Sequence, residues 1–262
     1  MRKDDGRDVG EMTGKNIVAF SGGKDSTAMA LLMAERGEPF EMLFTPAGDE
    51  PAELFEHVNR MVEMTGARLI TPDNKPLSFW VEHFNALPNH RQRWCTRLIK
   101  IEPCIAYLKQ HPGSTLNVGL RADEPPEDRT GLYGPYATYR YPLREAGLDL
   151  RGVLDFLRVR NIKVPKRTNC KRCYGQKIAE WYDFWRTDPE GWASAEEDEA
   201  RTGHTWRSPS RDTWPAALKD MRAEFERGRR PRGLRLPVFQ NGLFLDESTG
   251  EEEERECRVC RF

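Results

Sequence analysis

The sequence predicts an α/β protein with a mainly parallel sheet sandwiched by helices, followed by a smaller, partly helical region that carries four of the six cysteines. Short apolar runs alternate with amphipathic segments of helical period through the first half of the chain. This alternation is typical of an open parallel sheet with helices on both faces. A glycine turn directly follows the first apolar run, and the pattern changes after about residue 165. We therefore expect a flexible leader at 1–14, an α/β domain at 15–165 and a C-terminal region at 166–262.

The individual elements follow from hydrophobic period, segment length and helix-capping residues. We expect strands at 16–20, 40–44, 68–70 and 116–120. Between them we expect helices at 27–35, 51–65, 77–86 and 97–110. In the second half, helices are expected at 147–160 with Asp149 as N-cap, at 178–185 and at 216–227, with a polar, turn-rich stretch at 186–215.

Composition limits the classes of protein that this chain can be. Hydrophobic residues make up 38% and charged residues 32% of the 262 residues, which fits a folded domain better than a disordered one. The net charge of -1 excludes a strongly basic sheath for nucleic acid, although it permits local basic patches. No apolar run approaches the length of a membrane span, and the first 15 residues lack the apolar core of a signal peptide. We expect a cytoplasmic protein without membrane contact.

The most informative segment is Ser21-Gly22-Gly23-Lys24-Asp25-Ser26, between the first strand and the first helix. Glycines allow a sharp turn, and the N–H groups of such a turn attract anionic oxygens together with the N-terminus of the helix. Ser21 and Ser26 add hydroxyl groups, Lys24 adds a positive charge, and the carboxylate of Asp25 suits Mg²⁺. The spacing matches neither the P-loop of Walker NTPases nor a dinucleotide-binding turn. A capped glycine turn without a ligand is the alternative interpretation.

This loop resembles the PP-loop of the adenine nucleotide alpha hydrolase superfamily, in which ATP is cleaved between its α and β phosphates. Within that superfamily, the chain is similar to phosphoadenosine phosphosulfate (PAPS) reductase-like proteins over about residues 15–185. The segments that carry this similarity are Arg93–Thr96 with Lys100–Pro103, Gly119–Glu124, Tyr141–Leu143, and Val164-Pro165 before Cys170. The resemblance implies a Rossmann-like fold and ATP with Mg²⁺ as ligand. It also implies that Lys24 and Asp25 take part in catalysis, with Thr45 near the adenosine and Arg121 near the nucleotide.

Two departures separate the chain from the sulfonucleotide reductases of that family. Their PP-loop is altered, whereas the loop is intact here. Their C-terminal nucleophilic cysteine stands in a Glu-Cys-Gly-Leu/Ile-His motif, whereas Glu256-Cys257 is followed here by Arg258-Val259-Cys260. The resemblance therefore favours an enzyme that adenylates an acceptor for sulfur transfer, with DNA or RNA as the acceptor, a sulfur donor protein as a further partner and Cys257 as a catalytic thiol. A sulfonucleotide reductase that uses Cys257 and a zinc-stapled nucleic-acid binding module without catalysis are the alternatives.

The cysteines point to a metal or to redox chemistry. With no secretion signal, a disulfide framework is not expected. The pairs Cys170-x-x-Cys173 and Cys257-x-x-Cys260 suit four-thiolate zinc or a [4Fe–4S] cluster. In the reductase-like family, a cysteine at the position of Cys95 joins the later Cys-x-x-Cys in holding an iron–sulfur cluster. The resemblance thus implies a cluster on Cys95, Cys170 and Cys173, with Cys260 or Cys257 as fourth ligand, while zinc and free thiols remain alternatives.

Other candidates carry weaker signals. The stretch Arg158–Arg172 holds seven Lys or Arg residues, and a second basic run spans Arg227–Arg235. Either run could contact the phosphates of a nucleic acid or form ordinary solvated surface. Asp49-Glu50 could help bind Mg²⁺ or start the helix that follows. Arg121 could instead form a surface salt bridge.

Overall fold

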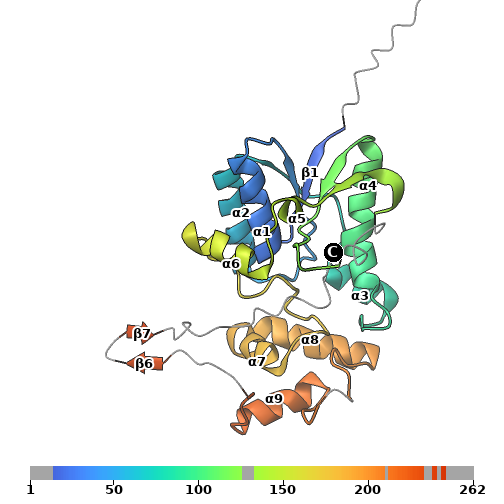
Figure 1. Ribbon diagram of the computed structural model, residues 1–262. Helices are drawn as coiled ribbons and strands as arrows, with labels where there is room; N and C mark the ends of the chain where they lie inside the picture. The colour runs from blue at the N-terminus through green and yellow to red at the C-terminus, as the bar shows by residue number, and fades with distance from the viewer. Residues whose placement is uncertain (1–13, 126–132, 210–211, 233–237, 241–242, 246–262) are drawn as a thin grey trace, which may run out of the picture. The chain divides into compact units, whose positions relative to one another are not determined.

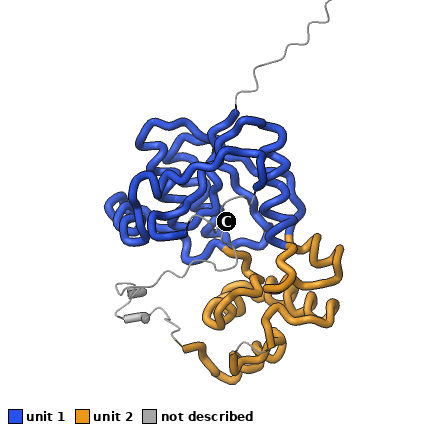
Figure 2. The backbone as a smooth tube through the Cα atoms, turned by 45° about the vertical axis from the view of Figure 1, so that its right-hand side comes forward, with its two compact units in different colours: residues 1–76, 95–168, 262 blue, residues 77–94, 169–261 orange. Residues whose placement is uncertain are grey.

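The computed structural model describes residues 14–125, 133–209, 212–232, 238–240 and 243–245. These residues form two compact units (Figure 2). The first unit contains the described residues up to Pro76 together with the described part of Cys95–Thr168, and the second contains Leu77–Trp94 and the described residues from Asn169 onward. The second unit thus begins its long segment close to the expected boundary at 165 and also takes one segment from within the expected α/β domain.

A five-stranded, fully parallel sheet forms the centre of the first unit, in the strand order β3-β2-β1-β4-β5. The strands are β1 (Asn16–Ala19), β2 (Glu41–Leu43), β3 (Arg68–Ile70), β4 (Thr115–Asn117) and β5 (Thr138–Arg140). In register, Ile17 of β1 lies opposite Glu41 on one side and Leu116 on the other. The chain moves from β1 outward through β2 and then returns to add β4 on the opposite side of β1. Ligands of open α/β sheets bind at such a switch point, beyond the carboxyl ends of the strands.

Helices cover both faces of this sheet (Figure 1). One face carries α1 (Lys24–Glu35), α2 (Ala52–Thr65), α5 (Pro142–Glu145) and α6 (Leu150–Val159), and the other carries α4 (Glu102–Gln110). Because side chains alternate along a strand, Val18 and Ile17 enter different cores. Val18 packs into the core with α1 and α2, whereas Ile17 joins Leu108 and Leu116 on the α4 side. The expected α/β sandwich is confirmed.

A π-helical turn, η1 (Thr96–Ile101), precedes α4, and a short 3₁₀ turn, η3, spans Gly134–Tyr136. In η1 the N–H of Glu102 bonds to the carbonyl of Arg97, five residues back. Pro103 explains part of this geometry, because it has no N–H to donate to the carbonyl of Ile99. The side-chain amide of Asn74 donates to that carbonyl instead, at 3.0 Å. The expected helix at 97–110 is therefore present, with a local widening before Pro103.

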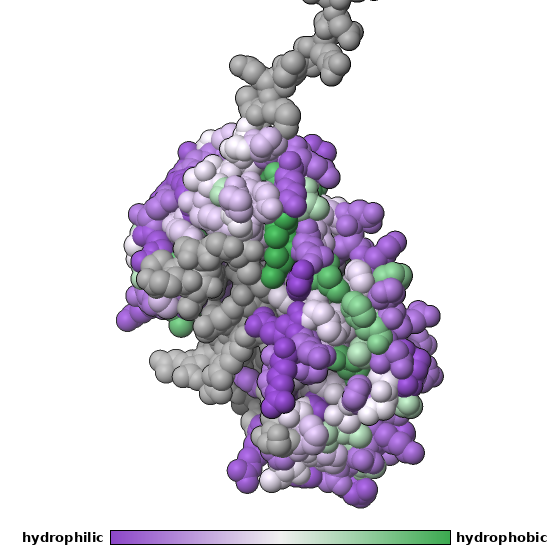
Figure 3. Space-filling view, turned by 90° about the vertical axis from the view of Figure 1, so that its right-hand side faces the viewer, coloured by the Kyte–Doolittle hydropathy of each residue, from purple (hydrophilic) through white to green (hydrophobic). Residues whose placement is uncertain are grey.

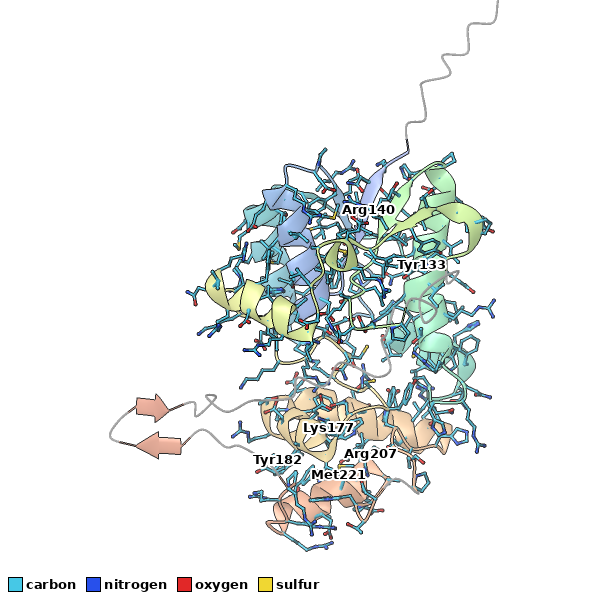
Figure 4. All side chains as sticks on the ribbon, in the orientation of Figure 1. Tyr133, Arg140, Lys177, Tyr182, Arg207 and Met221 are labelled. Carbon is cyan, nitrogen blue, oxygen red and sulfur yellow. The ribbon has the colours of Figure 1, made fainter. Side chains whose placement is uncertain are left out.

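The second unit is helical among its described residues, apart from one small hairpin. Its helices are α3 (Leu77–Phe84), α7 (Ile178–Thr187), α8 (Pro189–Thr202) and α9 (Leu218–Glu226), and its hairpin pairs β6 (Val238–Gln240) with β7 (Leu243–Leu245). The aromatic residues of α7 pack into this unit: Trp181 is fully buried, and the rings of Tyr182 and Phe225 meet at 5.1 Å. Figure 4 shows Tyr182 of α7 and Met221 of α9 in the region between these helices.

Several stretches of the chain differ from expectation, among them β5 and α5, neither of which was expected. Residues 186–215 were expected to be turn-rich, but α8 fills 189–202, with the Asp188 side chain accepting a hydrogen bond from the N–H of Gly191 at 2.9 Å. The strand expected at 116–120 ends at Asn117, so Gly119 and Leu120 belong to the loop beyond it. The N-cap role expected for Asp149 is confirmed, because its carboxylate accepts from the N–H of Gly152 at 2.7 Å.

The described surface is mainly polar. Hydrophilic residues cover most of the described part of the face drawn in Figure 3, and the hydrophobic residues on it form small groups. None of the described helices combines the length and the apolar character that crossing a membrane requires.

Candidate functional site

The glycine loop joins β1 to α1 at the carboxyl edge of the sheet. Helix α1 begins at Lys24, and its N-cap residue, Gly23, has no side chain that could cap the helix, so an N-terminal helix turn faces the glycine loop. Gly22 has φ +76°, and a Cβ placed there would overlap the Cδ1 atom of Leu54. Gly23 has φ -78°, and a Cβ there would meet only the Ser21 hydroxyl, at 3.5 Å. Gly22 is thus the glycine that the turn requires.

The two serines tie the ends of this loop together. Their hydroxyl oxygens lie 3.2 Å apart, and the Ser26 hydroxyl donates to the carbonyl of Gly23 at 3.1 Å. The N–H of Ser21 reaches the same hydroxyl at 3.3 Å. Ser21 is exposed, whereas Ser26 is buried at the start of α1. Both hydroxyls therefore lie beside the N-terminus of α1. There a phosphate oxygen can replace the hydrogen bond that the two hydroxyls make with each other.

Arg121 lies at the same edge of the sheet, against the first turn of α1. Its guanidinium forms ion pairs with Asp25 and with Asp123, each at 3.0 Å, and its own N–H donates to the Glu124 carboxylate at 3.0 Å. Only 7% of Arg121 is exposed. A surface salt bridge is therefore not an adequate description of Arg121. Lys24 is also buried, with its ammonium 3.7 Å from the carboxylate of Asp25.

A second glycine, Gly119, allows the loop after β4 to approach the glycine loop after β1 closely. A Cβ on Gly119 would lie 3.2 Å from the backbone of Asp25 and Ser26. The loop after β4 therefore passes directly against the N-terminus of α1, which brings Arg121 to Asp25 across 96 positions of sequence. Two loops from neighbouring parallel strands thus combine two cations, a helix N-terminus and three carboxylates in one place.

The loop after β2 contributes Thr45, Asp49 and Glu50. Thr45 is half-buried, and its side chain lies near the thiol of Cys104. Burial raises the pKa of Cys104 to about 12, so this thiol stays protonated and unreactive. The carboxylate of Glu50 accepts from the N–H groups of Ala47 and Asp49, at 2.6 and 3.1 Å, and so closes the loop. These contacts give Glu50 a structural role in positioning the loop.

His57 lies next to Gly22 of the glycine loop, at a position that no motif in the sequence marks. Its Nε2 is 2.9 Å from the hydroxyl of Thr27, and its Nδ1 is 2.9 Å from the guanidinium of Arg60. Since arginine can only donate, Nδ1 accepts and the proton stays on Nε2, which donates to Thr27. Burial, aided by the charge of Arg60, lowers the pKa of His57 to about 4. A neutral imidazole therefore braces α2 against α1 behind the loop.

This brace predicts a dependence of stability on pH. Unfolded His57 takes up a proton near pH 6.5, whereas the folded protein resists protonation until about pH 4. The contribution of neutral His57 to stability is therefore complete above pH 6.5 and is lost as the pH falls towards 4, about 3 kcal/mol in total. We expect urea denaturation to show that the advantage of wild type over His57→Gln shrinks between pH 7 and pH 4.5. An advantage independent of pH would show that folded His57 titrates normally.

The candidate metal ligands fall in different parts of the chain. Cys95 belongs to the first unit, whereas Cys170 and Cys173 belong to the second and share one turn, in which the N–H of Cys173 donates to the carbonyl of Cys170 at 3.1 Å. Cys257 and Cys260 lie outside the described residues. None of the described cysteines forms a disulfide, and in the described part of the chain no three His, Cys, Asp or Glu side chains gather as a metal would require.

The described members of the two basic runs are largely held in ion pairs within the protein. Arg160 pairs with Glu35, Lys171 with Asp188, and Arg172 with Asp198. In the later run, Arg227 and Arg229 both pair with Glu224. Such pairing favours the interpretation of these runs as ordinary surface over a continuous phosphate-binding patch.

Comparison with known proteins gives a family match to the first part of the chain. The phosphoadenosine phosphosulfate reductase domain family matches residues 15–132. An uncharacterized protein of Methanocaldococcus jannaschii is 30% identical over 95 residues, or 36% of this chain. The match spans only 22% of that relative's own length.

Two solved structures also resemble the chain. The phosphoadenylyl-sulfate (PAPS) reductase of Candida auris, in a phosphate complex, has a TM-score of 0.44 at 13% identity, covering 57% of this chain and 74% of that one. The NMN synthetase of Francisella tularensis has a TM-score of 0.43 at 17% identity, covering 87% and 90% respectively.

Proposed function

We propose that this chain, whose residues 15–132 match the phosphoadenosine phosphosulfate reductase domain family, is an ATP pyrophosphatase of the adenine nucleotide alpha hydrolase superfamily that adenylates an acceptor for sulfur transfer. One observation carries the proposal. The intact loop Ser21–Ser26 and the N-terminus of α1 lie beside Arg121, which arrives from the loop after β4. An intact loop with two buried cations suits the three phosphates of ATP better than a nucleotide that lacks the β–γ pair.

The chemistry assigns a role to each group in the loop. The acceptor oxygen attacks the α-phosphorus of ATP, the α–β bridging bond breaks, and pyrophosphate leaves with that bridging oxygen. Lys24, Arg121 and the N–H groups at the start of α1 stabilise the negative charge that grows on the leaving pyrophosphate. Asp25 sets the position of Arg121 through their 3.0 Å ion pair, and Mg²⁺ arrives with ATP as part of the substrate. Thr45, after β2, lies on the side proposed for adenosine.

The second half-reaction replaces the activated oxygen with sulfur. A sulfur nucleophile attacks the acceptor atom that bears the adenylated oxygen, and AMP leaves with that oxygen. We assign Cys95, Cys170, Cys173 and Cys260 as ligands of a [4Fe–4S] cluster, with zinc as the alternative, and the thiol of Cys257 as the sulfur carrier. Cys170 and Cys173 suit either group because both lie on one tight turn. Such a cluster, when bound, would hold or supply sulfur. A nucleic acid is the proposed acceptor, and a separate protein the proposed sulfur donor.

The proposal is tested by the products formed from ATP. Anaerobically purified protein, analysed for iron and zinc, should release AMP and pyrophosphate from ATP in an acceptor-dependent reaction. Lys24→Ala should slow this reaction at least about 100-fold, because it removes a cation from the site of developing charge. Arg151→Ala is the matched control, since that side chain is 91% exposed on α6. Release of ADP and phosphate would contradict the proposal, and sulfite release from a sulfonucleotide would favour the reductase alternative.

A further inference from the structure

A partly exposed cluster of aromatic rings lies on α3 and at Trp94, within the second unit. We call this cluster the aromatic platform, and its members are Phe79, Trp80, His83, Phe84 and Trp94. Phe79 and His83 stack almost in parallel, with their ring centroids 5.8 Å apart. Trp80 and Phe84 stack at 5.5 Å, and Phe84 then meets Trp94 at 5.4 Å. The rings therefore form one continuous set of contacts along the surface of the helix.

Part of the platform faces solvent. Leu77 and Val81 are the buried residues of α3. Phe79 and Phe84, by contrast, are 40% and 44% exposed, and His83 is exposed beside them. The spacing of four residues between stacked partners aligns ring faces along the helix. Ordered aromatic rings that are partly exposed to solvent are suited to stack with another flat ring.

Basic residues flank this platform on a short, well-defined tip. His90, Arg91 and Arg93 are exposed just before Trp94. The side-chain oxygen of Asn89 accepts hydrogen bonds from the N–H groups of Arg91 and Gln92, at 2.9 and 3.0 Å. These bonds fix the conformation of the backbone at this tip. Within Leu77–Trp94, Glu82 is the sole carboxylate in the sequence. The segment is therefore aromatic and basic together.

We propose that the aromatic platform binds single-stranded nucleic acid. Bases stack on the exposed faces of Phe79, His83 and Phe84, and phosphates lie against Arg91 and Arg93. Aromatic faces beside arginines are the chemistry by which proteins hold unpaired bases, and duplexes hide those base faces. Aromatic rings and arginines recognise flat bases and phosphates, which RNA and DNA strands share. This inference deepens the proposed function. It rests on that function for one claim, namely that the bound strand is the acceptor.

This surface differs from the basic runs singled out in the sequence. Arg160, Lys171 and Arg172 are held in ion pairs with carboxylates. Arg229 and Arg230 lie over the rings of Trp214 and Tyr182 respectively. Stacking on exposed rings, with a small number of phosphate contacts, is compatible with a net charge of -1, whereas a wide electrostatic patch is not.

Binding to the platform is measurable without any catalysis. Full-length protein is titrated into fluorescein-labelled 12-nucleotide RNA and DNA strands, without ATP, and anisotropy is recorded. Phe79→Ala should weaken binding about five- to 100-fold, because base stacking on an aromatic ring contributes that much. Phe79→Trp should retain binding, which separates stacking from folding. Phe55→Ala on α2 is the matched control, since Phe55 is also 40% exposed, and it should bind as wild type does.

A second pair of variants tests the phosphate contact. Arg91→Ala should weaken binding uniformly across sequences and reduce the dependence on salt by about one counterion, whereas Arg151→Ala should change neither. Equal binding by Phe79→Ala and wild type, or preference for a duplex, would overturn the proposal. So would a wild-type dimer that Phe79→Ala converts to a monomer. Strand binding without pyrophosphate release from ATP would support the aromatic platform and contradict the proposed adenylation. Pyrophosphate release without strand binding would support adenylation and contradict the platform.

Discussion

Gly22→Ala is expected to abolish ATP turnover, whereas Gly23→Ala is expected to give a folded protein that still binds the nucleotide. Gly22 has φ +76°, which costs a residue with a side chain about 1–2 kcal/mol. The added Cβ would also overlap the Cδ1 atom of the buried Leu54, so the Leu54 side chain or the loop must move. Gly23 has an ordinary φ of -78°, and the added methyl group meets only the Ser21 hydroxyl.

The two alanine variants form a matched pair, because each adds one methyl group to adjacent residues of the same loop. Pyrophosphate release and ATP binding by calorimetry would be measured on both, after circular dichroism has established that each is folded. Full activity in Gly22→Ala would mean that the turn tolerates a side chain and that the loop does not approach a ligand as closely as its geometry indicates.

Arg121→Met is expected to lose both stability and nucleotide turnover. Only 8% of the Arg121 side chain is exposed, and its removal leaves the carboxylates of Asp25 and Asp123 without their nearest cation. Breaking a buried ion pair by removing one partner costs about 3 kcal/mol or more. Lys24 remains 3.7 Å from Asp25 and offsets part of this cost. We expect turnover to fall by more than the fraction of unfolded protein explains, because the guanidinium is also proposed to bind phosphate.

A double-mutant cycle with Asp25→Asn separates the two effects. If the ion pair is the source of stability, Asp25→Asn should recover part of the loss in Arg121→Met, as measured by urea denaturation. Arg121→Lys should retain more stability than activity, since lysine supplies charge without the planar fork that binds a phosphate in two places. Wild-type turnover in Arg121→Met would remove this residue from the site.

The sequence predicted the elements whose signals are local. The strand before Ser21 and the helix that ends at Glu35 follow from an apolar run, a glycine pair and a helical period, although the helix begins at Lys24 rather than at the expected residue 27. Helix α8 was missed although its ends are marked in the sequence: Asp188 is the N-cap, Pro189 opens the helix and Gly203 ends it in the left-handed conformation. Its polar composition concealed these capping signals.

The rest of the candidate site depends on contacts between distant residues. The ion pair of Asp25 and Arg121 spans 96 positions. No hydrophobic period or sequence motif predicts which carboxylate an arginine pairs with over such a separation. His57 looked like one histidine in an amphipathic helix, and its role came from Thr27, 30 positions away. The basic runs were overestimated for the same reason, since the carboxylates that pair with them lie elsewhere in the chain.

The pairing of β4 with β1 has a consequence for the order in which the protein matures. Ser21–Ser26 emerges early during synthesis, but Gly119 and Arg121 complete the site only after Thr115 has paired with Asn16, 99 positions earlier. Contacts of such separation form late, because the entropy of closing a long chain segment opposes them. A nascent chain that stops before β4 therefore holds the loop without its cationic partner. Nucleotide affinity should then arise as a late event on the ribosome, reporting that the central strands have assembled.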